Sequence, residues 1–94
     1  MRVIGRQLLA AFIAAHADSE GALLAWLREV ESADWTHPGQ LKARFPSASL
    51  LAGGRVVFDI RGNRYRLLAV IVYGARVVRV EWLGTHAEYD RRRF

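Results

Sequence analysis

Residues 55–83 of this chain, RVVFDIRGNRYRLLAVIVYGARVVRVEWL, decide its fold. Apolar and polar side chains alternate through this stretch with the period of two that is typical of β-strands with one buried face. Gly62 and Asn63 interrupt the alternation once, and Gly74 and Ala75 interrupt it again. Because both pairs are typical of tight turns, the stretch predicts three antiparallel strands joined as a meander.

Two amphipathic helices are predicted ahead of these strands. Residues 6–15 carry an apolar stripe. A second helix is expected over residues 20–34, because Leu23, Trp26 and Val30 fall on one helix face. Helices that follow each other so closely can form a hairpin over one face of a sheet. The predicted fold class is therefore α+β, with two N-terminal helices packed on a small, mainly antiparallel sheet.

The segment between the helices and the strands, residues 33–54, is predicted to be irregular. It contains both prolines of the chain, at positions 38 and 46. Residues 40–44 are expected to make one helical turn, and Gly53 and Gly54 allow a tight bend before the first long strand. At the other end of the chain, residues 2–4 are expected to form a short strand that leads into the first helix.

The composition limits the possible classes of protein. The chain has 94 residues, of which 52% are hydrophobic, so a single domain spanning residues 1–94 is expected. The absence of cysteine excludes disulfides and thiolate metal sites. The three histidines lack the spacing of a metal site, and we expect no cofactor. The longest apolar run, residues 8–15, is shorter than the roughly 17 residues that span a bilayer. We therefore expect a cytoplasmic protein with no membrane partner.

The net charge of +5 is distributed unevenly. Residues 1–54 contain five cationic and five acidic side chains, whereas residues 55–94 contain nine arginines against four carboxylates. The whole net charge therefore lies in the C-terminal part, and every cation there is arginine. A guanidinium group can hold two phosphate oxygens at once. This asymmetry favours a nucleic-acid partner over a merely soluble surface.

The alternation of the strands predicts where these arginines point. If Tyr65 faces the helices, Arg64 and Arg66 face away from them. If Trp82 faces the helices together with its strand neighbours, Arg79 also faces away. The face of the sheet opposite the helices is then a basic concavity, bordered by the C-terminal segment. A register slip of one residue would invert this arrangement.

The last eleven residues, GTHAEYDRRRF at positions 84–94, bring together side chains that suit phosphodiester chemistry. RNA is cut without a metal when its 2′-hydroxyl attacks the adjacent phosphate, provided that protons are moved and the added negative charge is stabilised. His86 suits proton transfer, because an unperturbed imidazole has a pKa of about 6.5. Arg61, Arg66 or Arg79 suit stabilisation of the phosphate.

Each of these residues also has a plainer interpretation. A histidine at a strand end is more often a surface or capping residue than a catalyst. Tyr89 either stacks on a base, donates a hydrogen bond or packs on a C-terminal turn. Asp90 either orients His86 or pairs with a neighbouring arginine. The arginines at positions 91–93 are either a solvated tail or a source of nonspecific attraction for phosphate. Two functions remain, an endoribonuclease and a non-catalytic module that binds RNA or an acidic partner.

The order of several short motifs resembles the HigB toxins of the RelE-like superfamily. The resemblance covers nearly the whole chain. Its most specific parts are the segments FPSA, RGNRYR and GTHAEYD, in that order. The residues that carry it are Ala33-Asp-Trp35, Pro38, Lys42, Phe45-Pro-Ser-Ala48, Arg55-Val-Val-Phe58, Gly62-Asn-Arg-Tyr-Arg66 and Gly84-Thr-His-Ala-Glu-Tyr-Asp90.

This resemblance implies a toxin of a type II toxin–antitoxin pair. Toxins of this kind are mRNA interferases that cut translated messenger RNA in the ribosomal A site. A HigA-type helix-turn-helix antitoxin silences them, and promoter DNA is reached only through that antitoxin. The implied fold, a small sheet backed by helices, agrees with the alternation pattern.

The resemblance also implies a set of site residues. The catalytic candidates are Arg61, Arg66, Arg79, His86 and Tyr89. Arg64 and Lys42 are also carried over by position, and we assign them to RNA binding. Arg55, Arg91 and Arg92 are further RNA-binding candidates that the resemblance does not supply. No metal takes part in the implied reaction.

Overall fold

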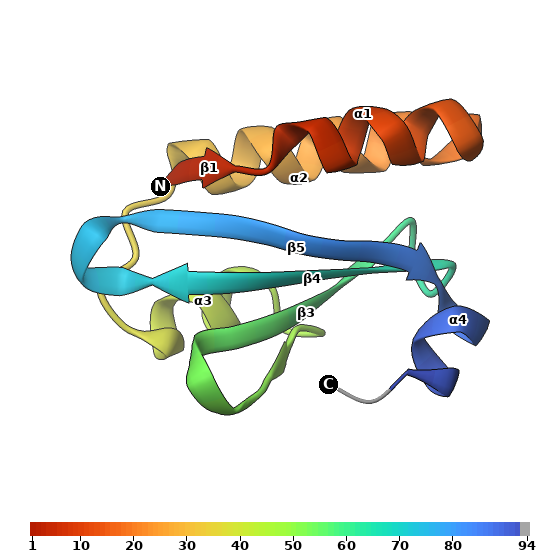
Figure 1. Cartoon of the computed structure of the whole chain (residues 1–94). Coiled ribbons are helices and arrows are strands. Elements are labelled where there is room, and N and C mark those ends of the chain that lie inside the picture. The colour runs from red at the N-terminus through yellow and green to blue at the C-terminus, as the bar shows by residue number, and fades with distance from the viewer. Residues whose placement is uncertain (93–94) are drawn as a thin grey trace.

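The computed structural model describes residues 1–92, which form a five-stranded sheet with four α-helices (Figure 1). In chain order, the elements are β1 (Arg2–Ile4), α1 (Arg6–Ala15), α2 (Glu20–Ser32), α3 (Pro38–Arg44), β2 (Ser49–Leu50), β3 (Arg55–Ile60), β4 (Tyr65–Val72), β5 (Val77–Thr85) and α4 (His86–Arg91). Short 3-10 turns cover Ala17–Ser19, Ala52–Gly54 and Tyr73–Ala75. None of the helices in residues 1–92 is long and apolar enough to cross a membrane.

The strands lie in the order β1-β5-β4-β3-β2. β1 runs parallel to β5, and every other pair is antiparallel. This arrangement confirms the predicted α+β class and the β3–β4–β5 meander. α1 and α2 run along the β1 and β5 side of the sheet and are joined by an ion pair between Arg6 and Glu31 (Figure 1). Both helices begin and end close to the predicted residues.

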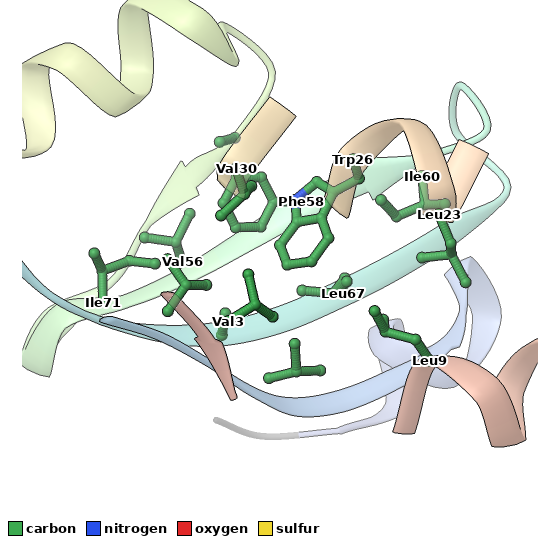
Figure 2. Packing of buried hydrophobic residues seen from close by; sticks show 14 of the residues in the cluster. Val3, Leu9, Leu23, Trp26, Val30, Val56, Phe58, Ile60, Leu67 and Ile71 are labelled. Carbon is green, nitrogen blue, oxygen red and sulfur yellow. The ribbon is translucent and has the colours of Figure 1, made fainter. Parts of the chain in front are cut away.

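The hydrophobic core lies between the helices and one face of the sheet. Figure 2 shows Leu23, Trp26 and Val30 of α2 among side chains of the strands. Trp26 meets Phe58 of β3 edge to face, with ring centroids 5.4 Å apart. Each large apolar side chain that is fully buried here contributes about 1.5–3 kcal/mol. The amphipathic pattern of α2 therefore fixes which face of the sheet is covered.

The pairing of β4 with β5 contains one irregularity, which places Trp82 on the opposite face of the sheet from the one predicted. Ala69 pairs with Val80, but the next residue of β4, Leu68, pairs with Trp82, so that Glu81 is an extra residue in β5. A bulge of this kind shifts the following side chains to the opposite face. Trp82 therefore lies on the face away from α1 and α2, which we call the outer face. The prediction that Trp82 faces the helices is wrong.

Each of the two hairpin turns places an arginine in left-handed backbone, which the sequence analysis did not predict. In the first turn Arg61 has φ 54° and Gly62 has φ 64°. In the second turn Arg76 has φ 56°. In the first turn the left-handed residues are therefore Arg61 and Gly62, and in the second turn Gly74 is not among the residues with positive φ. Both turns are nevertheless found where the composition predicts them.

Three elements go beyond the sequence prediction. The expected single turn at residues 40–44 is a longer helix, α3, which begins at Pro38 and is capped by His37, whose Nδ1 accepts from the amide of Gly39 at 3.1 Å. β2 adds a two-residue edge strand beside β3. The segment after β5, for which the sequence analysis assigned no element, is the helix α4.

Candidate functional site

α4 begins at the last residue of β5 because the sequence encodes a cap there. The Thr85 hydroxyl accepts from the amide of Glu88 at 3.1 Å, and the Glu88 carboxylate accepts from the amide of Thr85 at 2.8 Å. This capping box satisfies amide groups that a helix start leaves unpaired. The hydrogen bond from the Thr85 amide lowers the pKa of the Glu88 carboxyl. The cap therefore sets where His86 and Tyr89 lie.

His86 and Asp90 form a pair on one side of α4. The His86 Nδ1 lies 2.9 Å from Asp90 Oδ2, and the residues are four apart, as neighbours on a helix surface are. The Asp90 carboxylate thus lies on the Nδ1 side of the ring, which leaves Nε2 turned away from it. The amide of His86 donates to the carbonyl of Arg64 at 3.1 Å, which joins α4 to the β3–β4 turn. Of the two roles predicted for Asp90, the structure favours orientation of His86.

Arg66 is the arginine that the protein holds in place on the outer face. Its side chain is only 11% exposed, and its Nε lies 3.3 Å from Asp59 Oδ1. Its Nη2 donates to Asn63 Oδ1 at 2.6 Å, and its Nη1 donates to the carbonyls of Asn63 and Tyr65 at 3.2 and 3.3 Å. A guanidinium held at this many atoms has one orientation. Asn63 was not among the predicted site residues.

Two aromatic side chains and a second arginine lie beside Arg66. The Arg66 guanidinium is 6.0 Å from the centre of the Tyr89 ring. Tyr89 in turn lies 6.3 Å from Trp82, and the Arg92 guanidinium lies 5.2 Å from the Trp82 ring. We call Arg66, Trp82, Tyr89 and Arg92 the aromatic–arginine cluster. Aromatic faces next to guanidinium groups suit a single-stranded nucleic acid, in which bases stack and phosphates bind cations.

Gly84 makes room for this cluster. A Cβ added at this position would overlap the six-membered ring of Trp82 and would lie 3.2 Å from Glu88 Oε1. Only glycine therefore lets the indole ring lie across β5 at this point. The bulge at Glu81 and the missing side chain at Gly84 together place Trp82 beside Tyr89.

Arg61 and Arg64 point to the other side of the sheet. The Asp18 carboxylate accepts from Arg61 Nη1 at 2.7 Å and from the Tyr65 hydroxyl at 2.5 Å, and it lies 3.3 Å from Arg64 Nε. The tyrosine hydrogen bond, followed by the arginine charges, lowers the pKa of Asp18, and the same bond raises the pKa of Tyr65. Because Asp18 belongs to the α1–α2 connection, the prediction that Arg64 faces away from the helices is wrong.

Arg79 and Arg55 lie on the outer face but farther along the sheet. Both pair with Val70 of β4, one from each neighbouring strand. Four residues of strand separate Arg66 from Val70, or about 13 Å at about 3.3 Å per residue. Arg79 Nε lies 3.3 Å from Glu81 Oε2, and Arg55 Nε donates to the carbonyl of Ala52 at 3.2 Å. Arg66 and Arg79 therefore share a face, as predicted, without being neighbours.

The remaining predicted residues lie apart from the cluster. Lys42 belongs to α3, on the helical side of the sheet, and its Nζ donates to the carbonyl of Ala48 at 2.5 Å. Arg91 is the exposed last residue of α4. Arg93, the end of the predicted arginine run, lies outside the described residues. Within residues 1–92, no group of three or more histidine, aspartate or glutamate side chains could hold a metal ion.

The geometry therefore divides the predicted site. Contacts through Tyr89 and Trp82 link Arg66 to Arg92, and His86 lies on the same short helix as Tyr89. Arg61 and Arg64 are instead tied to Asp18. Sequence reasoning missed Asn63 and misplaced Trp82. The pattern did contain a signal for Asn63, because a turn residue with an amide side chain often bonds nearby groups.

Comparison with known proteins points in one direction. A family model, described as HigB_toxin, the RelE-like toxic component of a toxin–antitoxin system, matches residues 19–92. No curated protein matches the chain.

Proposed function

This chain belongs to the HigB toxin family, the RelE-like toxic components of toxin–antitoxin systems, and on that premise we propose that it is a metal-independent endoribonuclease of messenger RNA. The proposed reaction takes place on the ribosome, in the cytoplasm. The observation that carries the proposal is the His86–Asp90 pair, which begins one helical turn before Tyr89, the residue that lies over Arg66. An imidazole paired with a carboxylate, on the same short helix as a tyrosine that contacts a fixed cation, suits phosphodiester chemistry.

The proposed reaction begins at the 2′-hydroxyl of the substrate. His86 Nε2 takes the 2′ proton while the 2′-oxygen attacks the adjacent phosphorus, and the bond from phosphorus to the 5′-oxygen breaks. The 5′-oxygen takes a proton from solvent water as it leaves, and the protonated His86 afterwards returns its proton to solvent. The products are a 2′,3′-cyclic phosphate and a 5′-hydroxyl. Asp90 keeps the imidazole in the tautomer that can accept and stabilises the imidazolium that forms.

Arg66 is proposed to stabilise the negative charge that develops on the phosphate. Its contacts with Asp59 and Asn63 hold the guanidinium before substrate arrives, so that little reorganisation accompanies the reaction. Tyr89 is proposed to stack on a base or to donate a hydrogen bond to the phosphate. Arg92, together with Arg91, adds attraction for the backbone.

The partner proposed for this toxin is a HigA-type helix-turn-helix antitoxin. Membership of the family implies an antitoxin, because the family consists of toxic components of such pairs. The finer proposal is that this antitoxin silences the toxin and that the pair reaches promoter DNA through the antitoxin alone.

A cleavage assay on translating ribosomes tests the nuclease proposal. Primer extension on messenger RNA should reveal cuts with the wild-type chain, and His86→Ala should reduce the cleavage rate by about 10²–10⁴-fold. Arg66→Ala should reduce it by a similar factor, while Arg28→Ala, an arginine on the outer surface of α2, should leave it unchanged. Folded variants of His86 and Arg66 that cut at the wild-type rate would exclude this site.

A non-catalytic module that binds RNA through its arginines is the second candidate. One observation favours it, namely that Arg61, Arg64 and Arg79 do not converge on His86. This function predicts that binding to the ribosome or to RNA weakens steeply as the salt concentration rises. It also predicts that no new messenger RNA ends appear, whichever residue is replaced. The same primer-extension assay therefore separates the two functions.

A further inference from the structure

The outer face carries a second distinct surface at the end of the sheet that is far from α4. The strand register places Arg55, Val70, Arg79 and Ile4 side by side in one row across the sheet. In the neighbouring row on the same face, Val72 and Arg2 lie on either side of a residue of β5. Val3 and Val78, which alternate with these residues, are buried on the helical side. We call Arg2, Ile4, Arg55, Val70, Val72 and Arg79 the distal patch.

Two aliphatic side chains of the distal patch are unusually exposed for a sheet. Ile4 is 42% exposed and Val72 is 45% exposed. Apolar side chains that lie together on a surface are often found at interaction sites. They contribute to binding only by burial against other apolar groups. They offer no aromatic face on which a nucleobase could stack.

The charge of the distal patch has one sign. Arg2 and Arg55 form no ion pair with any residue in the 1–92 range, and Arg79, with a half-exposed side chain, pairs with Glu81. Three guanidinium groups thus surround the exposed valine and isoleucine. A partner that fits must be acidic at its edges and aliphatic at its centre. A second copy of this chain fits poorly, because a two-fold interface would place these arginines against each other.

We propose that the distal patch docks an acidic, aliphatic segment of the antitoxin. The proposal needs the toxin–antitoxin membership of the chain and not its nuclease chemistry. Since about 13 Å of β4 separates Val70 from Arg66, the segment can lie on the patch without filling the aromatic–arginine cluster.

Paired substitutions at Val72 test both the location of the docking surface and the acidic character of the antitoxin segment. Val72→Asp and Val72→Lys both remove apolar surface, but only the aspartate repels an acidic partner. For the antitoxin partner of this chain, we expect Val72→Asp to raise the Kd at least tenfold and Val72→Lys to raise it about threefold or less. Leu24, 41% exposed on α2, provides the matched control. Both Leu24→Asp and Leu24→Lys should leave the Kd within about twofold of the wild-type value.

Hydrogen exchange on the wild-type complex gives a second readout that needs no variant. The amides of residues 2–4, 70–72 and 77–79 should gain protection when the antitoxin binds. Absence of this protection, no binding by the wild-type chain, or equal Kd values for Val72→Asp and wild type would each overturn the proposal. So would a Val72→Asp variant that loses RNA binding or self-association instead of antitoxin binding. A chain that cuts no RNA but shows the expected Kd pattern would exclude the nuclease and leave the docking surface intact.

Discussion

At the scale of single residues, Arg66 shows how a turn can order a cation in advance of the proposed substrate. Most surface arginines lose side-chain freedom when they bind a phosphate, and that loss weakens binding. Arg66 has already lost it, because Asn63 and Asp59 hold three of its nitrogen atoms. The fold therefore bears this entropic cost, and binding of the substrate does not.

Replacement of Asn63 tests whether this ordering matters. Asn63→Ala removes the side-chain acceptor of Arg66 and should lower kcat for messenger cleavage by about tenfold to a hundredfold, since hydrogen bonds to charged groups contribute about 1.5–3 kcal/mol. The KM for programmed ribosomes should change little. Asn63→Asp keeps an acceptor oxygen and should restore most of the rate. If the alanine and wild-type rates are equal, Asn63 does not position Arg66.

Gly84 offers a second test at the scale of one residue. Gly84→Ala places a methyl group where the Trp82 ring lies, so we expect the ring to move and the protein to lose about 1–3 kcal/mol of unfolding free energy. Tryptophan fluorescence should report the displacement, and denaturant titration should report the stability. Gly21→Ala, where no atom lies within 4 Å of the added carbon, should not destabilise the protein. An equally stable Gly84→Ala would mean that Trp82 does not need this space.

At the scale of elements, α4 is a short helix that depends on its cap. Six residues are too few for a stable helix in isolation. The capping box of Thr85 and Glu88 and the bond from the His86 amide to Arg64 hold it against the sheet. His86, Tyr89 and Asp90 all belong to this element, so its order decides whether the site is assembled.

Thr85→Ala should therefore impair function more than folding. Loss of an N-cap hydroxyl typically costs about 1 kcal/mol, which here falls mainly on the helix that it caps. We expect faster amide exchange in residues 88–91 and a several-fold drop in cleavage, with a nearly unchanged global transition. Thr36→Ala, at the start of α3, is the control and should leave α4 exchange unchanged. Slower exchange or full activity in Thr85→Ala would contradict this role for the cap.

Elements with a long, regular pattern could be predicted from the sequence. The spacing of Leu23, Trp26 and Val30 identified α2 and its buried face, and the alternation after Arg55 identified the meander. Both patterns repeat over several turns or residues, and each repeat supports the same assignment. The shared outer face of Arg66 and Arg79 followed correctly from this alternation.

The features that escaped prediction depend on a single residue each. Nothing in the composition marks Glu81 as the extra residue of β5, yet it alone decides which face Trp82 takes. Arg64 was misplaced because a turn has no alternation, and its guanidinium follows the distant Asp18. The start of α4 did carry a signal, since Thr85 and Glu88 have the spacing of a capping box.

At the scale of the whole molecule, Asp18 ties the helical layer to the sheet. Its carboxylate accepts hydrogen bonds from the hydroxyl of Tyr65 and the guanidinium of Arg61, which are 47 and 43 residues away in the chain. His16 and Phe12 add ring contacts with Tyr65 on the same side. The connection between α1 and α2 is thereby fixed to the turn between β3 and β4. This turn contains Arg64, whose carbonyl anchors α4.

The stabilising effect of the hydrogen bond between Asp18 and Tyr65 should be lost both in acid and in alkali. The pKa of Asp18 is lowered from 3.8 in the folded protein, so its contribution is present above that value and disappears as the pH falls through the folded pKa. The pKa of Tyr65 is raised from 10.0, so its contribution is present below that value and disappears as the pH rises through the folded pKa. The difference in unfolding free energy between wild type and Tyr65→Phe should thus be largest between about pH 5 and 9 and narrow in acid and in alkali.

Chemical denaturation across the pH range measures this difference. The difference in unfolding free energy between wild type and Asp18→Asn should likewise shrink in acid, where Asp18 is protonated, and in alkali, where Tyr65 loses the proton that it donates to Asp18. Tyr73→Phe is the matched tyrosine control, because burial alone raises the pKa of Tyr73 and its effect should vary only in alkali. If the difference in unfolding free energy between wild type and Tyr65→Phe stays constant down to strong acid, the hydrogen bond to Asp18 does not contribute to stability. The attachment of the helical layer to the sheet would then depend on the apolar core and on the ion pairs of Arg61 and Arg64 with Asp18.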